Sequence, residues 1–127
     1  MRKAFTLIEL LIVIVIIGIL AAIAIPKFAN SKSKSYYTAM KNDLRNLVTA
    51  EQAFFSDSGK YTPNLGSLKF RASNGVNPPV ISVPGGGRAW SATVTHSQMS
   101  SDAQCAIAVG IGNPLAPTDT SGAPVCK

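Results

Sequence analysis

Few side chains in this 127-residue sequence could carry out acid–base, nucleophilic or metal chemistry, and they lie far apart along the chain. His96 is the only histidine, and no pair of carboxylates or nucleophile motif surrounds it. Asp102 and Asp119 are the only acidic residues after Asp57, too few for the roughly six to eight oxygen ligands of a calcium site. The glycine run 85–87 lacks the lysine and hydroxyl residue of a phosphate-binding loop. The sequence therefore predicts no enzyme, no metal and no cofactor.

One carboxylate, Glu9, lies near the start of a run of apolar residues, 5–26. As an α-helix this run would be about 31 Å long, which matches the ~30 Å hydrocarbon core of a bilayer. An acidic group in a membrane helix costs on the order of 3 kcal/mol and usually marks a function with a partner nearby. We therefore favour a specific partner for Glu9 over a carboxylate that is merely tolerated at the membrane interface.

Arg2 and Lys3 precede the apolar run, so the positive-inside rule keeps the N-terminus in the cytoplasm and places residues 27 onward outside. Three interpretations of the run compete: a cleaved signal peptide, a permanent single-span anchor, and a processed subunit that leaves the membrane during assembly. Ala22-Ile23-Ala24 fits signal peptidase and would make Ile25 the first mature residue. Against this, the run exceeds the usual 7 to 15 apolar residues of a signal peptide, and the helical pattern continues beyond the cut.

Cys105 and Cys126 are the only cysteines. Two cysteines after a membrane segment indicate an oxidising compartment and one disulfide, whereas zinc normally needs more ligands and two unrelated thiols are less expected in an exported chain. The disulfide would restrain a loop of about 20 residues that is rich in proline and glycine.

Residues 27–59 predict an amphipathic helix that ends near Ser58 and Gly59. Pro26 should bend the rod where the helices join, because it lacks the amide that would bond to the carbonyl of Ala22. Gly18 is a second weak point, worth about 1 kcal/mol relative to alanine. The apolar face consists of Tyr37, Met40, Leu44, Leu47 or Val48, and Phe54 or Phe55, and the polar face of Lys34, Lys41, Asn42, Arg45, Asn46 and Thr49.

Beyond residue 60 the pattern changes from helical to extended. Strands are expected at 68–72, 80–83, 90–96 and 103–111, with turns at 61–64 and 73–75. The fold class is therefore α+β: a long N-terminal helix whose amphipathic half packs against a small antiparallel sheet.

At its N-terminus the chain resembles the type IV pilins and the related pseudopilins. The resemblance rests on the short basic leader Met1-Arg2-Lys3-Ala4, the run Phe5-Thr6-Leu7-Ile8-Glu9, the uninterrupted apolar helix and Pro26. It implies a long helix packed on an antiparallel sheet, with the disulfide bounding an exposed C-terminal region. The four expected segments are a leader (1–4), a membrane and filament-core helix (5–26), an amphipathic helix (27–59) and a β-sheet region (60–127).

The resemblance also implies roles for single residues. A prepilin peptidase would cut between Ala4 and Phe5, and the new amine of Phe5 would be N-methylated. Ala4 stands where the family more commonly has glycine, and it keeps the residue before the cut small. Glu9 would neutralise the N-terminal amine of a neighbouring subunit during assembly. The stretch between Gly18 and Pro26 would lose helicity in the filament.

The expected function is that of a structural subunit of a type IV pilus. Its expected partners are other copies of the chain, the prepilin peptidase, the membrane before assembly, and an inner-membrane platform with its ATPase. The protein would start as a single-pass inner-membrane precursor and end at the cell surface. The alternatives are a pseudopilin of a type II secretion system and a monomeric membrane-anchored or secreted binding domain. Weak binding to DNA or to surfaces is a secondary alternative, because the chain has ten basic and five acidic residues from Lys27 onward. Solvated charges flanking the span are the favoured interpretation, because no aromatic residue is clearly interleaved with the basic ones.

Overall fold

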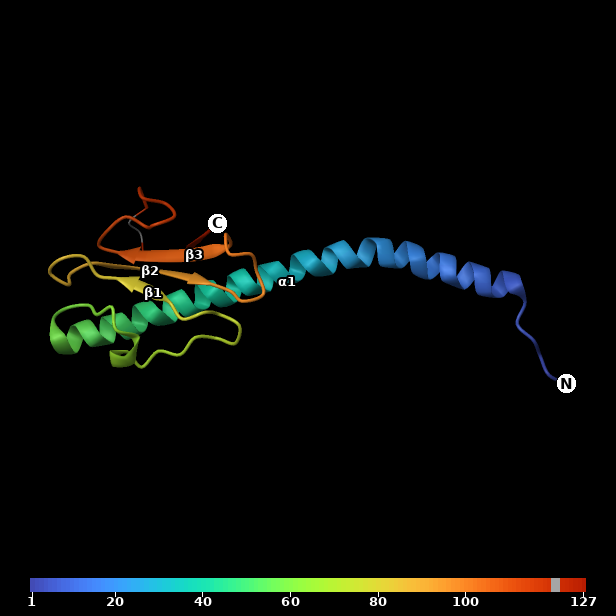
Figure 1. Cartoon of the computed structure of the whole chain (residues 1–127), viewed down its shortest axis with the longest axis horizontal. Helices are drawn as coiled ribbons and strands as arrows, with labels where there is room; N and C mark the ends of the chain where they lie inside the picture. Colours follow the sequence, from blue (N-terminus) through green and yellow to red (C-terminus); the bar gives the residue numbers. More distant parts are fainter. Residues whose placement is uncertain (120–121) are drawn as a thin grey trace. The chain divides into compact units, whose positions relative to one another are not determined.

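The structure is a computed structural model that describes residues 1–119 and 122–127. Its elements in chain order are helix α1 (Leu7–Ser58), a 3₁₀ turn η1 (Leu65–Ser67), and strands β1 (Val80–Ser82), β2 (Trp90–Thr95), β3 (Gln104–Val109) and β4 (Val125–Cys126) (Figure 1). The chain divides into two compact units, Met1–Lys34 and Ser35–Lys127, and α1 contributes to both. The predicted α+β fold is confirmed.

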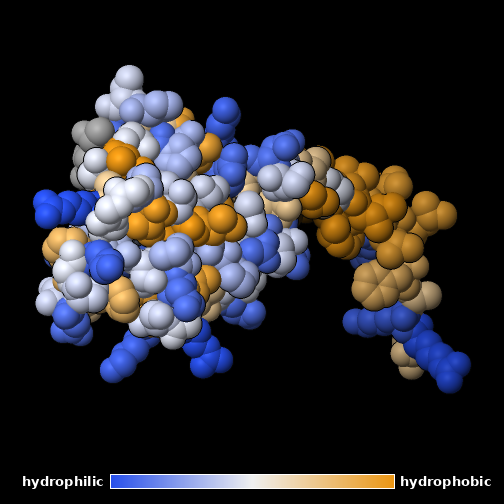
Figure 2. Space-filling model, turned by 60° about the vertical axis from the view of Figure 1, so that its left-hand side comes forward, coloured by the Kyte–Doolittle hydropathy of each residue, from blue (hydrophilic) through white to orange (hydrophobic). Residues whose placement is uncertain are grey.

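The first unit consists of the N-terminal residues and the apolar part of α1. Every large apolar side chain from residue 7 to residue 25 is between 49% and 82% exposed, and these side chains form the apolar surface over this part of the helix in Figure 2. Within the described residues, α1 is the one helix long and apolar enough to cross a membrane. The helix continues through Pro26. Exposure of this much apolar surface to water is unfavourable.

The second unit is built on the amphipathic part of α1. Met40, Leu44 and Leu47 are fully buried, as the three- and four-residue spacing predicted. They belong to one apolar cluster with the inward-facing side chains of the sheet, which include Trp90, Ala92, Val94, Cys105 and Ile107. The helix ends at Ser58, and Gly59 follows with a φ of 75°, the left-handed conformation expected at a helix terminus.

The four strands form one antiparallel sheet in the order β1-β2-β3-β4. The central pair, β2 and β3, runs in register from Trp90 opposite Val109 to Thr95 opposite Gln104. The strands predicted near 80–83, 90–96 and 103–111 are confirmed as β1, β2 and β3 with slightly shorter bounds.

The strand predicted at 68–72 is wrong. This segment follows η1 and has no ladder partner among the described residues, although Leu68 is buried and Phe70 and Ala72 pack on the core. Its apolar side chains do alternate with exposed ones, but the backbone is fixed by hydrogen bonds to a side chain rather than by pairing with another strand. Asp43 on α1 accepts hydrogen bonds from the amide (2.7 Å) and the hydroxyl (2.7 Å) of Ser73, which fixes the end of the segment.

The predicted disulfide between Cys105 and Cys126 is present. The two cysteines face each other across the pairing of β3 with β4, and their Cα atoms are 4.0 Å apart. Inside the loop that the disulfide closes, Asn113 is buried and donates its side-chain amide to the carbonyl of Ala106 at 2.9 Å. The covalent bond and this hydrogen bond together hold the loop against the sheet.

Replacement of Cys126 by serine should lower the thermal midpoint of the full-length protein in detergent by more than 10 °C. A crosslink that closes a loop of this length contributes about 3 kcal/mol, and 1 kcal/mol shifts the midpoint by roughly 4–8 °C in a domain of this size. The matched control is Ser101→Ala, a change on the exposed surface that should leave the midpoint unchanged. Equal melting of the Cys126→Ser variant and the wild type would contradict this contribution of the disulfide.

Candidate functional site

The carboxylate of Glu9 is held by the residue that precedes helix α1. One of its oxygens, Oε2, accepts hydrogen bonds from the backbone amide of Thr6 at 2.8 Å and from the Thr6 hydroxyl at 2.7 Å. The Thr6 hydroxyl oxygen in turn accepts from the amide of Glu9 at 3.3 Å. This reciprocal arrangement is a capping box, and it satisfies amides that the first turn of a helix leaves without partners. Its signal, threonine followed three residues later by glutamate, is visible in the sequence, although it was not part of the sequence prediction.

The bond between Ala4 and Phe5 lies before the start of α1, in backbone that is not helical. Both residues are exposed, and the Phe5 side chain is 86% exposed. Glu9 already binds the amide of Thr6, one residue from the nitrogen of Phe5. A free amine at Phe5 would therefore lie close to a fixed carboxylate.

Glu9 is the one charged residue between Lys3 and Lys27. Gly18 lies within the same stretch of α1, and a side chain added at Gly18 would meet no atom within 4 Å. Pro26 lies inside the helix. The arrangement is thus an exposed apolar rod that carries one negative charge at its beginning. Such a rod suits recognition by lipid and by other copies of itself better than chemistry on a small molecule.

Comparisons with known proteins match both this rod and the chain as a whole. The family model described as the prokaryotic N-terminal methylation motif matches residues 1–25. A fimbrial protein of Eikenella corrodens, EcpC, is 35% identical over 106 residues, which are 81% of this chain and 69% of that protein. The chain belongs to the type IV pilin family.

Other relatives are similar over a shorter region. The type IV major pilin protein PilA of Myxococcus xanthus is 44% identical over 74 residues, which cover 58% of this pilin and 34% of the relative. Fimbrial protein Q of Moraxella bovis is 52% identical over 65 residues, which cover 51% of this pilin and 40% of the relative. The pilin thus spans well under half the length of these two relatives.

The only histidine in the sequence lies in the packed interior of the second unit. His96 is buried and stacks on Tyr36 with ring centroids 4.2 Å apart, and its Nδ1 accepts a hydrogen bond from the amide of Gln98 at 3.1 Å. Gly75 approaches the ring so closely that a Cβ there would lie 2.7 Å from the histidine Nε2. No group of three or more metal-ligating side chains occurs in the part of the chain that the structure describes.

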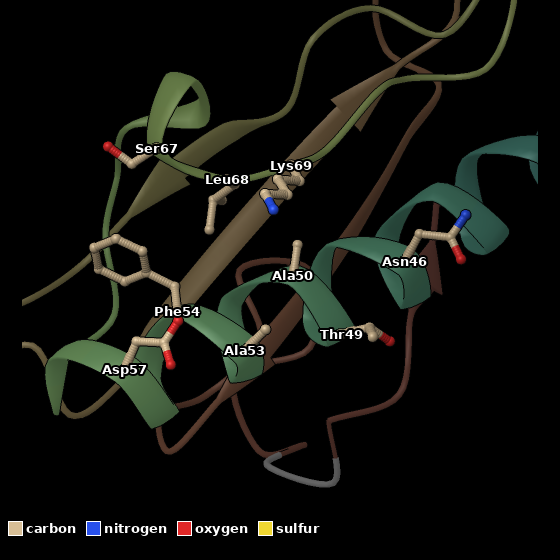
Figure 3. A pocket seen from close by; sticks show the side chains of 9 residues that line it. All are labelled: Asn46, Thr49, Ala50, Ala53, Phe54, Asp57, Ser67, Leu68 and Lys69. Atoms are coloured by element: carbon tan, nitrogen blue, oxygen red, sulfur yellow. The ribbon is translucent and has the colours of Figure 1, made fainter.

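The pilin also has a shallow groove of about 440 Å³ beside the last turns of α1 (Figure 3). Its apolar lining includes Ala50, Phe54 and Leu68, and the charged side chains of Asp57 and Lys69 also line it. Its hydroxyl side chains, Thr49 and Ser67, have no histidine beside them in the lining, and Asp57 is its one acidic residue.

Two acidic residues on α1 are buried in the second unit, and the sequence prediction did not place them there. Asp43 is satisfied by Ser73, as described above. Glu51 is fully buried, and its Oε2 accepts a hydrogen bond from the amide of Thr62 at 3.0 Å, whereas its Oε1 has no partner among the described residues. Burial raises the pKa of Glu51, and the hydrogen bond from Thr62 only partly opposes this effect. Folding therefore shifts the ionisation of Glu51 towards its protonated form relative to the unfolded chain.

Stability should consequently fall as pH rises through the range just above the ordinary pKa of glutamate. The folded state holds this proton more tightly than the unfolded chain, so ionisation costs folding free energy until the folded-state pKa has been passed. Glu51→Gln removes this titration and should raise the melting temperature at pH 7 by a few degrees. Melting curves of both proteins between pH 4 and pH 8 measure the difference.

The matched control is Asp43→Asn, which should lower the melting temperature at pH 7 because it weakens two hydrogen bonds to a charged acceptor. If Glu51→Gln also lowers the melting temperature and leaves its pH dependence unchanged, ionisation of Glu51 does not cost folding free energy.

Proposed function

We propose that this pilin is the structural subunit of a type IV pilus, and that its activity is assembly rather than catalysis. The observation that carries the proposal is the exposed apolar part of α1 with one capped carboxylate at its start. The match to the methylation motif over residues 1–25 and the relatives named as pilins and fimbrial proteins support it.

In this proposal the chain is first a single-pass inner-membrane protein with residues 1–4 in the cytoplasm. A prepilin peptidase cuts between Ala4 and Phe5, where the backbone is exposed and not helical. The amine of Phe5 is then methylated. The basic pair Arg2 and Lys3 is lost with the leader, and Glu9 is the one remaining charged side chain before Lys27.

Assembly replaces lipid contacts with contacts between apolar helices. Glu9 pairs with the Phe5 amine of a neighbouring copy, which compensates a carboxylate that would otherwise lie alone among apolar groups. Removing one partner of a buried ion pair costs about 3–5 kcal/mol, so the pair selects one register between neighbouring helices. An inner-membrane platform and its ATPase supply the work of extrusion. Flexibility near Gly18 and Pro26 would let the helix lose some turns when the filament is stretched.

The pseudopilin alternative is less well supported. The C-terminal region is bounded by the disulfide between Cys105 and Cys126, as the resemblance to type IV pilins implies. Relatives that align over 74 and 106 residues are named as a pilin and a fimbrial protein.

Intact-mass spectrometry of material sheared from the cell surface should give a chain that begins at Phe5 and carries one methyl group. This result follows from cleavage after Ala4 and methylation of the new amine. A chain that begins at Ile25 would show an ordinary signal peptide and would refute the proposal.

Replacement of Glu9 by valine should leave the precursor in the membrane but reduce the yield of sheared filaments at least about tenfold. A hydrogen bond to a charged group contributes about 1.5–3 kcal/mol, and the valine variant loses it at each junction. Glu9→Gln is the matched variant, because it keeps an acceptor for Thr6 and removes only the charge. Filament yield equal to wild type in both variants would show that Glu9 does not pair with the amine.

A further inference from the structure

One end of the second unit presents two exposed cations next to each other. The amide of Tyr61 donates to the carbonyl of Gly87 at 2.8 Å, which joins the turn after α1 to the turn before β2. Gly87 has a φ of 68°, and a Cβ there would lie 2.8 Å from the Cβ of Lys60, so a glycine is needed for this approach. Lys60 and Arg88 flank the junction and are both exposed. Asp57 precedes them on α1 but lines the groove with Lys69.

The opposite end of the sheet presents one exposed carboxylate. The hairpin between β2 and β3 is closed by bonds from the amide of Met99 to the carbonyl of His96 (3.1 Å) and from the amide of Ala103 to the carbonyl of Ser100 (3.0 Å). Asp102 lies exposed in this hairpin. Lys127 pairs through its backbone with Gln104 and is exposed, so this end carries a lysine as well as the carboxylate of Asp102.

A cleft of about 370 Å³ lies against the same hairpin. Its lining is rich in hydrogen-bond acceptors that carry no charge, and it includes the stacked pair of Tyr36 and His96. Amide and hydroxyl oxygens beside an aromatic pair suit a planar guanidinium, which stacks on rings and donates several hydrogen bonds. The lining residues besides the ring pair are Ser35, Ala39, Asn74, Gly75, Ser97 and Gln98.

The two ends cannot meet within one copy. Arg88 lies two residues before the start of β2 and Asp102 two residues before the start of β3, and the two strands are antiparallel. A six-residue strand such as β2 spans about 17 Å. Lys60, Arg88 and Asp102 form no ion pair within the described residues, so each is available to a second molecule.

We propose that Arg88 of one copy, with Lys60 beside it, docks on the hairpin of a second copy. There its guanidinium pairs with Asp102 and lies in the cleft next to Tyr36 and His96. The contact uses different surfaces on the two copies, and a contact of this kind builds a ring or, where the rotation does not close, an open helical polymer such as a filament. The inference rests on the proposed function, because it names where the globular parts of neighbouring pilins touch.

The favoured occupant is a second copy rather than a polyanion because both halves of the contact are present on one chain. A polyanion such as DNA would bind Lys60 and Arg88 and would make no favourable contact with Asp102. The two partners therefore predict different results for Asp102.

Charge reversal tests the contact in the full chain. Arg88→Glu and Asp102→Arg should each lower the yield of sheared filaments at least about fivefold, because each places like charges together. The double variant should recover to within about twofold of wild type. Arg71→Glu is the matched control, since Arg71 is an exposed arginine between η1 and β1, and it should leave the yield unchanged. Precursor levels in the membrane and the melting temperature of each variant show whether it folds.

The outcomes separate this inference from the proposed function. Normal filament yield in both single variants, or no recovery in the double variant, would overturn the docking contact. If Glu9→Val abolishes filaments in the same experiment, the proposed function stands without the contact. Loss of DNA binding by Arg88→Glu with no effect of Asp102→Arg on filaments would assign the cations to a polyanion instead.

Discussion

The structure depends on one constraint: the apolar surface of α1 from residue 7 to residue 25 cannot remain in water. Fourteen large aliphatic side chains lie there, each about half exposed or more. Full burial of one such side chain is worth about 1.5–3 kcal/mol, so covering the remaining surface gains on the order of 20 kcal/mol. That exceeds the roughly 5–15 kcal/mol by which a typical domain is folded. This surface therefore suits cover by a lipid bilayer or by a bundle of identical helices, as the proposed function requires.

Three carboxylates on α1 are held by hydrogen bonds: Glu9, which is exposed, and Asp43 and Glu51, which are buried. Thr6 supplies two donors to Glu9, and Ser73 supplies two to Asp43. Burial raises the pKa of Glu51, and the hydrogen bond from the amide of Thr62 only partly opposes this effect. In the first unit the bonds from Thr6 also hold the carboxylate beside the nitrogen that cleavage would expose. A local helix cap would thus position Glu9 for the contact between subunits that is proposed above.

The parts of the fold that could be predicted from sequence are those set by local pattern. Met40, Leu44 and Leu47 recur at helical spacing, and the alternation in β2 marks a strand with one buried face. The segment 68–72 shows the same alternation, yet pairing depends on a neighbouring strand that local pattern does not reveal. Asp43 and Glu51 continue the buried stripe at three and four residues from its apolar members. Their burial depends on donors at Ser73 and Thr62, which are distant in sequence and join them only in the fold.

Burial of these two acids changes the charge that the pilin shows to its surroundings. From Lys27 onward the chain has ten basic and five acidic residues, and two of the five acids are withdrawn into the core. The surface is consequently more basic than the composition suggests. Identical basic subunits stacked in a filament repel one another, and at physiological ionic strength the repulsion is screened beyond about 8 Å. Close contacts between neighbours must then supply a specific attraction, and the few remaining surface carboxylates are the groups able to provide it. The same excess of positive charge, repeated along a filament, would attract polyanions through many weak contacts even where one subunit binds them poorly.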